Sequence, residues 1–316
     1  MNKDLNEPIK PADVGQGPVR VSNIMKDDFG LDIPTEAVPL PSRGIIYPQE
    51  SGFYSKETLD IKPMTAREED ILTSRAFIKN GTVLTELMKS CLIDKSINPD
   101  ELISGDRNAI LISLRITGYG ADYSLEIDCP ECGARNKQTF DLSQLKIKRL
   151  EVEPVSPGQN LFEVVLPVTK KNVKVRFLTG VDEKEMLIIE QRRKKSGFET
   201  TSTVTDRLSR SIVSIDGIKD KNKINAFVRN IPVRDSLALR KFLDTHEPGI
   251  EMKSWMTCTS CHEESEVKIP MGVTFFWPDT EWSRCSFRTS FCFNVLYGIY
   301  ISGYKKYTHL EKRMVY

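Results

Sequence analysis

The chain has 316 residues, of which 39% are hydrophobic and 28% are charged, and these values are ordinary for a globular protein with a sizeable core. Its net charge of +1 provides no overall attraction to nucleic acid or to an anionic membrane surface. No run of 18 apolar residues occurs, which excludes a transmembrane helix.

Residues 1–50 contain seven prolines, and this density disfavours both a continuous helix and a central strand. The segment from Met1 to Asp28 is polar and has no apolar core of the kind a signal peptide needs. We therefore expect the protein to reside in a reducing cytosol, where disulfides are rare. Residues 1–50 are predicted to be an extended or disordered arm, either a disordered leader or an arm that orders on a partner.

Residues 51–145 are predicted to form a first α+β unit. The strand-like run TLDIKP precedes Thr65 and Glu68, which have the spacing of a capping box and so start a helix. Apolar residues at helical spacing predict a second helix over 82–92. A third helix is expected to be N-capped by Asp106 and to end near Gly120, before the first Cys-x-x-Cys.

Residues 146–159 are predicted to be a linker to a second unit, residues 160–272. The runs NLFEVVLPV and KKNVKVRFL alternate between apolar and polar residues, which predicts a hairpin. A charged helix, EKEMLIIEQRRKK, is expected next. Its basic end is accounted for by the helix dipole without any phosphate ligand.

The second unit repeats the order of elements in the first. When the sequence is compared with itself at a shift of 129 residues, Asp106 matches Asp235, and both cysteines of the first Cys-x-x-Cys match those of the second. Shifts of 121 and 115 residues align the segments that precede them. We therefore predict an α+β fold of two tandem pseudo-symmetric repeats, related by a pseudo-twofold axis. Each repeat would consist of a strand, three helices and a zinc-knuckle hairpin.

The two Cys-x-x-Cys pairs are the strongest chemical signal in the sequence. Each pair supplies two thiolates from a tight turn, and zinc prefers four such ligands in a tetrahedron. We predict one structural zinc ion that joins the repeats, held by Cys129, Cys132, Cys258 and Cys261. A rubredoxin-like iron site or free thiols are the alternatives. His262 is expected to face solvent, and four cysteine ligands would leave no open position for catalytic water.

Residues 273–316 form a tail that is rich in aromatic residues and locally basic. The aromatic side chains are too numerous for a solvated tail, so we expect them to dock on the body of the protein or on a partner. Binding to a membrane surface is a secondary alternative.

The sequence contains no recognisable catalytic motif. Its three histidines are scattered, and neither a Walker loop nor a Gly-x-Ser-x-Gly elbow is present. We therefore expect no enzymatic activity and no small-molecule substrate.

Three segments in combination resemble one known family: PLPSRGIIYP, IKPMTAREEDILTS and LISGDRNAILISLRITGYGADYSLEIDCPECG. With the second Cys-x-x-Cys before IPMGVTFFWPD, they are similar to the baseplate hub proteins of contractile-tailed bacteriophages, from about Pro39 to Asp279. The resemblance implies a non-enzymatic hub subunit or hub assembly factor that works with other baseplate hub and tape-measure proteins. The resemblance also implies that the family's cysteine pairs correspond to the four cysteines named above. The last 35 residues do not resemble the family.

We expect a late tail morphogenesis protein, located in the host cytoplasm during assembly and, if retained, in the virion tail baseplate. The alternative is a zinc-ribbon regulator that binds nucleic acid. The charges beside the two cysteine pairs disfavour it, because acidic residues there outnumber basic ones. They are Glu126, Asp128 and Glu131 against Arg135 and Lys137, and Glu263, Glu264 and Glu266 against Lys253 and Lys268.

Overall fold

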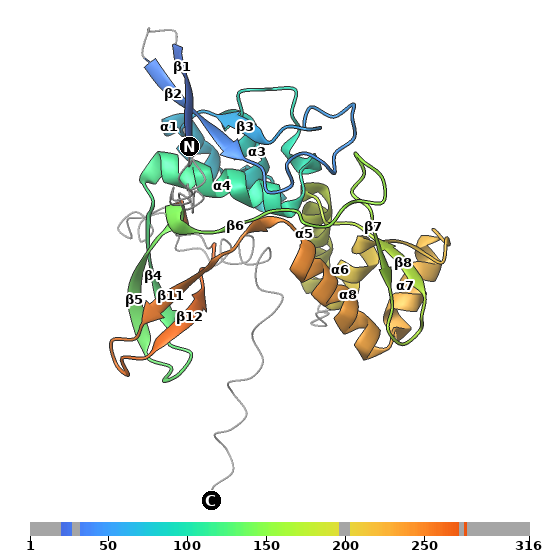
Figure 1. Ribbon diagram of the computed structural model, residues 1–316. Coiled ribbons are helices and arrows are strands. Elements are labelled where there is room, and N and C mark those ends of the chain that lie inside the picture. The colour runs from blue at the N-terminus through green and yellow to red at the C-terminus, as the bar shows by residue number, and fades with distance from the viewer. Residues whose placement is uncertain (1–19, 27–31, 196–202, 272–274, 277–316) are drawn as a thin grey trace, which may run out of the picture.

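The computed structural model describes residues 20–26, 32–195, 203–271 and 275–276 (Figure 1). Within these residues the fold is mixed α+β, as predicted, and it combines helices with small antiparallel sheets. None of the described helices is long and apolar enough to span a membrane.

The first half begins with an antiparallel sheet in the order β1-β2-β3 and continues with helices and a hairpin. Its elements are β1 (Arg20–Lys26), β2 (Asp32–Pro39), β3 (Thr58–Ile61), α1 (Ala66–Thr73), α2 (Arg75–Asn80), α3 (Val83–Cys91), the 3-10 helix η1 (Pro99–Glu101), α4 (Ser104–Tyr119), β4 (Asp122–Asp128), β5 (Arg135–Asp141) and the 3-10 helix η2 (Leu142–Gln144).

The second half contains a sheet in the order β7-β8-β9, further helices and a second hairpin. Its elements are β6 (Ile147–Lys148), β7 (Phe162–Val165), β8 (Asn172–Val175), α5 (Gly180–Lys195), α6 (Thr203–Ser211), β9 (Ile212–Ile215), α7 (Lys221–Asn230), α8 (Val233–His246), β10 (Gly249–Ile250), β11 (Lys253–Thr257) and β12 (Glu264–Lys268). The predicted β7–β8 hairpin and the charged helix α5 are therefore present.

The prediction of an arm over residues 1–50 is wrong for the part after residue 32. β2 is the central strand of its sheet, and Val38, Leu40 and Ile46 are buried in the hydrophobic core. Its prolines are tolerated because β1 pairs only with residues 32–37 and β3 only with residues 36–39. Pro34 and Pro39 thus lie where β2 has a single neighbour, and the strand is locally an edge. Residues 1–19 of the predicted arm lie outside the described residues.

The capping box predicted for the first helix is confirmed. Glu68 accepts hydrogen bonds from the backbone N–H and the hydroxyl of Thr65, and also from the Ser90 hydroxyl at 2.5 Å. Burial opposes the charged form of Glu68, but these hydrogen bonds outweigh it and lower its pKa to about 2. This carboxylate therefore ties the start of α1 to the end of α3.

Asp106 and Asp235 do not cap their helices as predicted. They occupy the third positions of α4 and α8, whose N-cap residues are Ile103 and Pro232. The fully buried carboxylate of Asp106 accepts hydrogen bonds from the Ser42 N–H at 3.0 Å and from the Tyr47 hydroxyl at 2.5 Å. Each Asp thus binds a loop that follows a strand of its own half: Asp106 binds the loop after β2, and Asp235 accepts from two N–H groups just after β7.

Each half contains four α-helices in the described residues, rather than the predicted three. Some contacts recur in both halves. Thr179 donates to Asp182 at the start of α5 as Thr65 donates to Glu68 at the start of α1, and both α4 and α8 lead into a hairpin. The predicted linker, residues 146–159, contains β6, which pairs with β10 of the second half. The tandem repeat itself stays a prediction.

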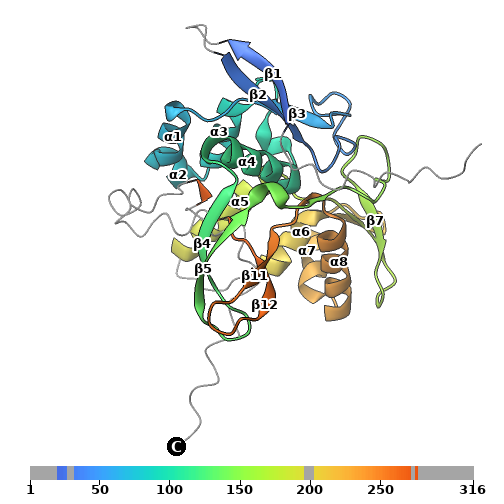
Figure 2. The same ribbon diagram turned by 60° about the vertical axis from the view of Figure 1, so that its left-hand side comes forward.

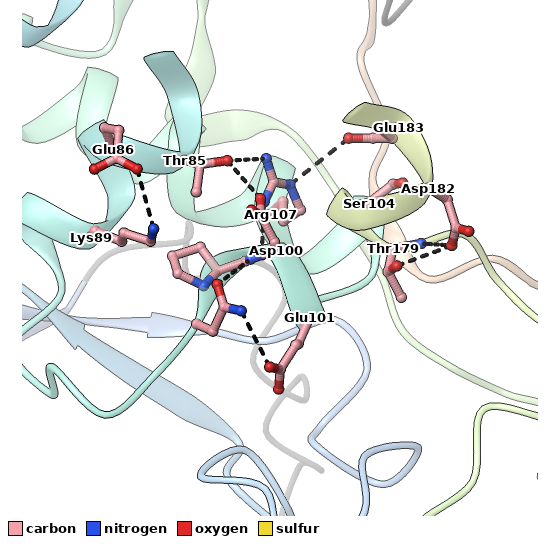
Figure 3. A network of polar contacts seen from close by, with 12 residues as sticks. Thr85, Glu86, Lys89, Asp100, Glu101, Ser104, Arg107, Thr179, Asp182 and Glu183 are labelled. Atoms are coloured by element: carbon pink, nitrogen blue, oxygen red, sulfur yellow. Dashed lines mark hydrogen bonds and ion pairs between the residues drawn. The ribbon is translucent and has the colours of Figure 1, made fainter. Parts of the chain in front are cut away.

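The two halves meet at the N-terminal end of α4. The Ser104 N–H donates to the Leu178 carbonyl at 3.0 Å, and the Gly180 N–H donates to the Leu102 carbonyl at 3.0 Å. Beside this junction Arg107 joins four elements: it donates to the Pro99 carbonyl, contacts Asp100 of η1 and Thr85 of α3, and lies 3.8 Å from Glu183 of α5 (Figure 3). The hydrophobic core is continuous through both halves.

Two residues of the predicted C-terminal tail are described. Phe275 and Phe276 are buried, and the Phe275 ring packs edge-on against Tyr123 with centroids 5.3 Å apart. The start of this segment therefore docks on the body of the protein. The other aromatic residues of the predicted tail lie outside the described residues.

We predict that Gly105→Ala destabilises the protein by at least about 3 kcal/mol. A Cβ at this helical position would lie 1.7 Å from the Pro248 carbonyl oxygen, so the junction between the halves must open. Chemical denaturation monitored by circular dichroism checks this result. Gly52→Ala is the matched control, because its Cβ would meet only ordinary contacts at 3.5 Å. Equal stability of the two variants would contradict the close packing at α4.

Candidate metal centre

Two hairpins from distant parts of the chain lie side by side. β4 pairs with β5 from Asp122 to Asp141, and β11 pairs with β12 from Lys253 to Lys268. Both views of the molecule show the two hairpins next to each other at one side (Figures 1 and 2). The Gln138 side chain on β5 donates to the Thr257 carbonyl at 3.0 Å and so joins the hairpins directly.

The turns of the two hairpins have the same hydrogen bonds. The Cys129 N–H donates to the Ala134 carbonyl and its own carbonyl accepts from Gly133, both at 2.9 Å. Cys258 makes the same pair of bonds, with Glu263 and His262, both at 3.0 Å. Gly133 and His262 have φ values of 71° and 60°, so each turn passes through the left-handed region at the same place. Each turn thereby directs two cysteines toward one point.

The four predicted cysteines are brought together. All four sulfur atoms lie within 4.8 Å of one another. The Cys129 and Cys261 sulfurs are 3.8 Å apart, and those of Cys132 and Cys258 are 3.6 Å apart. A tetrahedron with metal–sulfur bonds of about 2.3 Å has sulfur–sulfur edges of about 3.8 Å, whereas a disulfide requires about 2.0 Å. The spacing fits a shared metal ion and excludes disulfides among these thiols.

The arrangement of the sulfurs is symmetric between the hairpins. In each close contact the first cysteine of one pair meets the second cysteine of the other. The first cysteines, Cys129 and Cys258, are buried, whereas Cys132 and Cys261 are exposed. Each hairpin thus supplies one inner and one outer ligand, and neither could complete a tetrahedral site alone.

The environment of Cys258 favours the thiolate. Hydrogen bonds from the backbone N–H groups of Cys261 and Ser260 lower its pKa to about 6, and the thiolate is the form that binds metals. Cys91 is a contrasting case, because burial raises its pKa to about 12. Cys91 is the last residue of α3, its side chain is buried, and it is not one of the four clustered cysteines. His262 is exposed, as expected.

Asn136 is a residue of this site that the sequence analysis missed. It is buried on β5, and its side-chain oxygen accepts from the N–H and the hydroxyl of Thr259, at 2.8 and 2.6 Å. Its amide nitrogen lies 3.5 Å from the Cys258 sulfur, within reach of a weak N–H···S bond. Asn136 thus connects the first hairpin to a metal-ligand turn of the second. A polar residue at an inward position of an alternating strand was the available signal.

Comparison with known proteins gives one family match. The family model described as T4 bacteriophage base plate protein matches residues 54–277, a range that includes both hairpins and nearly all of the core. No curated protein and no solved structure matches the chain.

We predict that Cys129→Ser removes the bound metal and lowers the melting temperature by roughly 10 °C or more, because a structural metal contributes on the order of 10 kcal/mol. Elemental analysis of the purified protein and thermal denaturation check this. The matched control is Cys91→Ser, which changes a thiol outside the cluster and should keep the metal. Unchanged metal content and melting in Cys129→Ser would show that the cluster is not a metal staple.

Asn136→Ala is expected to leave four ligands in place but to speed metal loss to a chelator by roughly tenfold to a hundredfold, the range for lost support around a metal site. The physical reason is that the Cys258 turn loses three contacts to the first hairpin. Gln138→Ala, which removes one exposed hydrogen bond between the same hairpins, should change the rate much less. Equal rates of metal loss in the two variants would show that Asn136 does not support the metal site.

Proposed function

Since the chain belongs to the family of T4 bacteriophage base plate proteins, we propose that it is a non-enzymatic subunit or assembly factor of the baseplate hub. It acts through contacts with other proteins during tail assembly. The observation that carries this proposal is the family match over residues 54–277, which covers both hairpins rather than a single motif.

The four-cysteine cluster supports a structural part in this function. We propose that it holds one zinc ion through Cys129, Cys132, Cys258 and Cys261. Four thiolates fill a tetrahedral site and leave no position for a substrate or a reactive water, so the ion would fasten the hairpins together rather than perform chemistry. Elemental analysis distinguishes zinc from the iron alternative.

The proposed partners are other baseplate hub proteins and the tape-measure protein, met in the host cytoplasm before the tail is complete. Support comes from the family, whose members belong to the baseplate. We also propose that the chain consists of two tandem repeats. The matching Asp and Thr contacts at the starts of α1 and α5, and of α4 and α8, support this organisation.

The alternative function, a zinc-ribbon regulator that binds nucleic acid, receives no support from the hairpins. Arg135 lies 3.2 Å from Asp128 and 3.8 Å from Glu126, and Lys253 lies 3.1 Å from Glu266. These cations face carboxylates of their own hairpins, and phosphate binding would have to compete with those pairs.

We expect the tagged chain, captured from infected cells, to bring down baseplate hub and tape-measure proteins, identified by mass spectrometry. Comparison of free lysate with sedimented tails separates two versions of the proposal. Partners found only in free lysate indicate an assembly factor, and the same partners in tails indicate a structural subunit. Cys129→Ser is the matched variant, and it should lose the partners if the fastened hairpins are needed. Recovery of nucleic acid or transcription proteins instead would overturn the proposal.

A further inference from the structure

Exposed apolar side chains are distributed unevenly along the chain. Nine large hydrophobic residues are exposed among the described residues, and all of them lie at or after Val155. Three lie at the start of α8, one is the last residue of β7, and one is the tryptophan on the outer face of the β11–β12 hairpin. They are Val165, Val168, Val233, Leu237 and Trp255.

Val168, Val233 and Leu237 lie at the start of α8 and are here called the α8 patch. Val233 and Leu237 are 79% and 56% exposed and lie one helical turn apart. Asp235 lies between them and accepts a hydrogen bond at 2.7 Å from the Val168 N–H. Val168, in the turn after β7, is thus held against the first turn of α8, and Val165 is the last residue of β7. Two elements therefore contribute to a fixed apolar surface.

The corresponding surface of the first half is covered. The start of α4 has the same buried aspartate, Asp106, but there Ser104 donates to Leu178 and Gly105 packs against Pro248 of the second half. No described segment of the chain makes such contacts with the first turn of α8, where Val233 remains exposed. The helix start that is covered in the first half is thus bare in the second, where Val233 and Leu237 take the positions of Ser104 and Asn108.

The edge of the α8 patch is basic. Residues 216–241 contain seven lysines and arginines against three aspartates, and one of these aspartates, Asp235, is buried. Exposed cations lie directly beside the patch at Lys170, Arg234 and Lys241. A surface that covers the patch would bind best if it combined an apolar group with carboxylates.

The outer face of the β11–β12 hairpin combines an exposed tryptophan with carboxylates, and it also carries Lys253 and Lys268, of which Lys253 pairs with Glu266 at 3.1 Å. Trp255 is 68% exposed, and Glu266 lies opposite it on β12. Glu263 and Glu264 lie at the neighbouring turn and are exposed. The two hairpin segments, 122–141 and 251–268, together hold nine acidic and four basic residues. In the view of Figure 1 the two hairpins and helix α8 are separate parts of the molecule.

The first hairpin offers a natural comparison. The residue 129 positions before Trp255 is Glu126, which lies on the exposed face of β4 and faces Arg135. The same face therefore has a paired charge on one hairpin and an exposed tryptophan on the other. An exposed tryptophan is costly to leave in water and is enriched at the centres of protein interfaces.

We propose that the Trp255 face of one copy docks on the α8 patch of a second copy. Trp255 lies against Val233 and Leu237, and the exposed carboxylates at the hairpin turn, Glu263 and Glu264, lie near Arg234 and Lys241. The contact joins two different surfaces, so each copy in a pair keeps one free surface of each kind. Such head-to-tail contacts build chains or closed rings rather than twofold dimers. This inference does not depend on the proposed partners.

The first test is the mass of the purified, metal-loaded full chain by sedimentation velocity over a range of protein and salt concentrations. We expect species above the 36.0 kDa of one chain, which shrink as salt screens the charges. Trp255→Thr and Leu237→Glu should each weaken the association by roughly thirtyfold or more. Glu126→Thr, at the matching position of the first hairpin, should leave it unchanged.

Mixing the two variants gives the sharper test. Trp255→Thr retains an intact α8 patch, and Leu237→Glu retains an intact hairpin face, so the mixture should form a species of two chains and stop there. A mixture that stays monomeric, a wild-type chain that stays monomeric, or a Glu126→Thr chain that loses association would each overturn the proposal. The proposal would also be overturned if Trp255→Thr still associated with itself but no longer bound a different protein. Circular dichroism and metal content confirm that the variants fold.

Discussion

The convergence of four thiols at one point is the constraint on which the arrangement of the molecule depends. Cys129 and Cys258 lie in separate hairpins, yet their turns have the same hydrogen bonds and their sulfurs meet those of the opposite pair at 3.6 and 3.8 Å. Neither hairpin could hold a tetrahedral ion alone. A metal bound here would therefore stabilise only the conformation in which both halves of the chain are already folded and adjacent.

A second junction holds the halves together at some distance from the hairpins. There the start of α4 is packed so closely that Gly105 has no room for a side chain beside Pro248. Arg107 completes this junction, because its guanidinium reaches η1 and α3 of the first half and the first turn of α5 (Figure 3). Two separate junctions resist rotation of one half against the other, which a single metal site would permit. Two junctions of this kind suit the proposed function, in which the protein acts through contacts with other proteins.

The halves share contacts but are not placed equivalently. At the cluster, the first cysteine of each hairpin contacts the second cysteine of the other. The helix starts differ, because the start of α4 is covered by the second half whereas the start of α8 is bare. The large apolar side chains that are exposed among the described residues all lie at or after Val155, and the most exposed are Val233 and Trp255. Acidic hairpins and a basic α7–α8 region also give a nearly neutral chain two oppositely charged sides. Under the proposed self-association, this charge difference would favour contact between unlike sides of two copies.

The sequence by itself determined the features that depend on close neighbours along the chain. The Cys-x-x-Cys spacing indicated the cluster, the Thr65 and Glu68 spacing indicated the capping box, and alternation indicated the β7–β8 hairpin, because these signals act within a few residues. Only the tertiary structure decided the contacts between distant segments. It placed residues 38–46 in the core despite their prolines, directed Asp106 to Ser42 and Tyr47, and brought Asn136 to the Cys258 turn. Such contacts depend on which segments meet after folding, and local composition does not encode that.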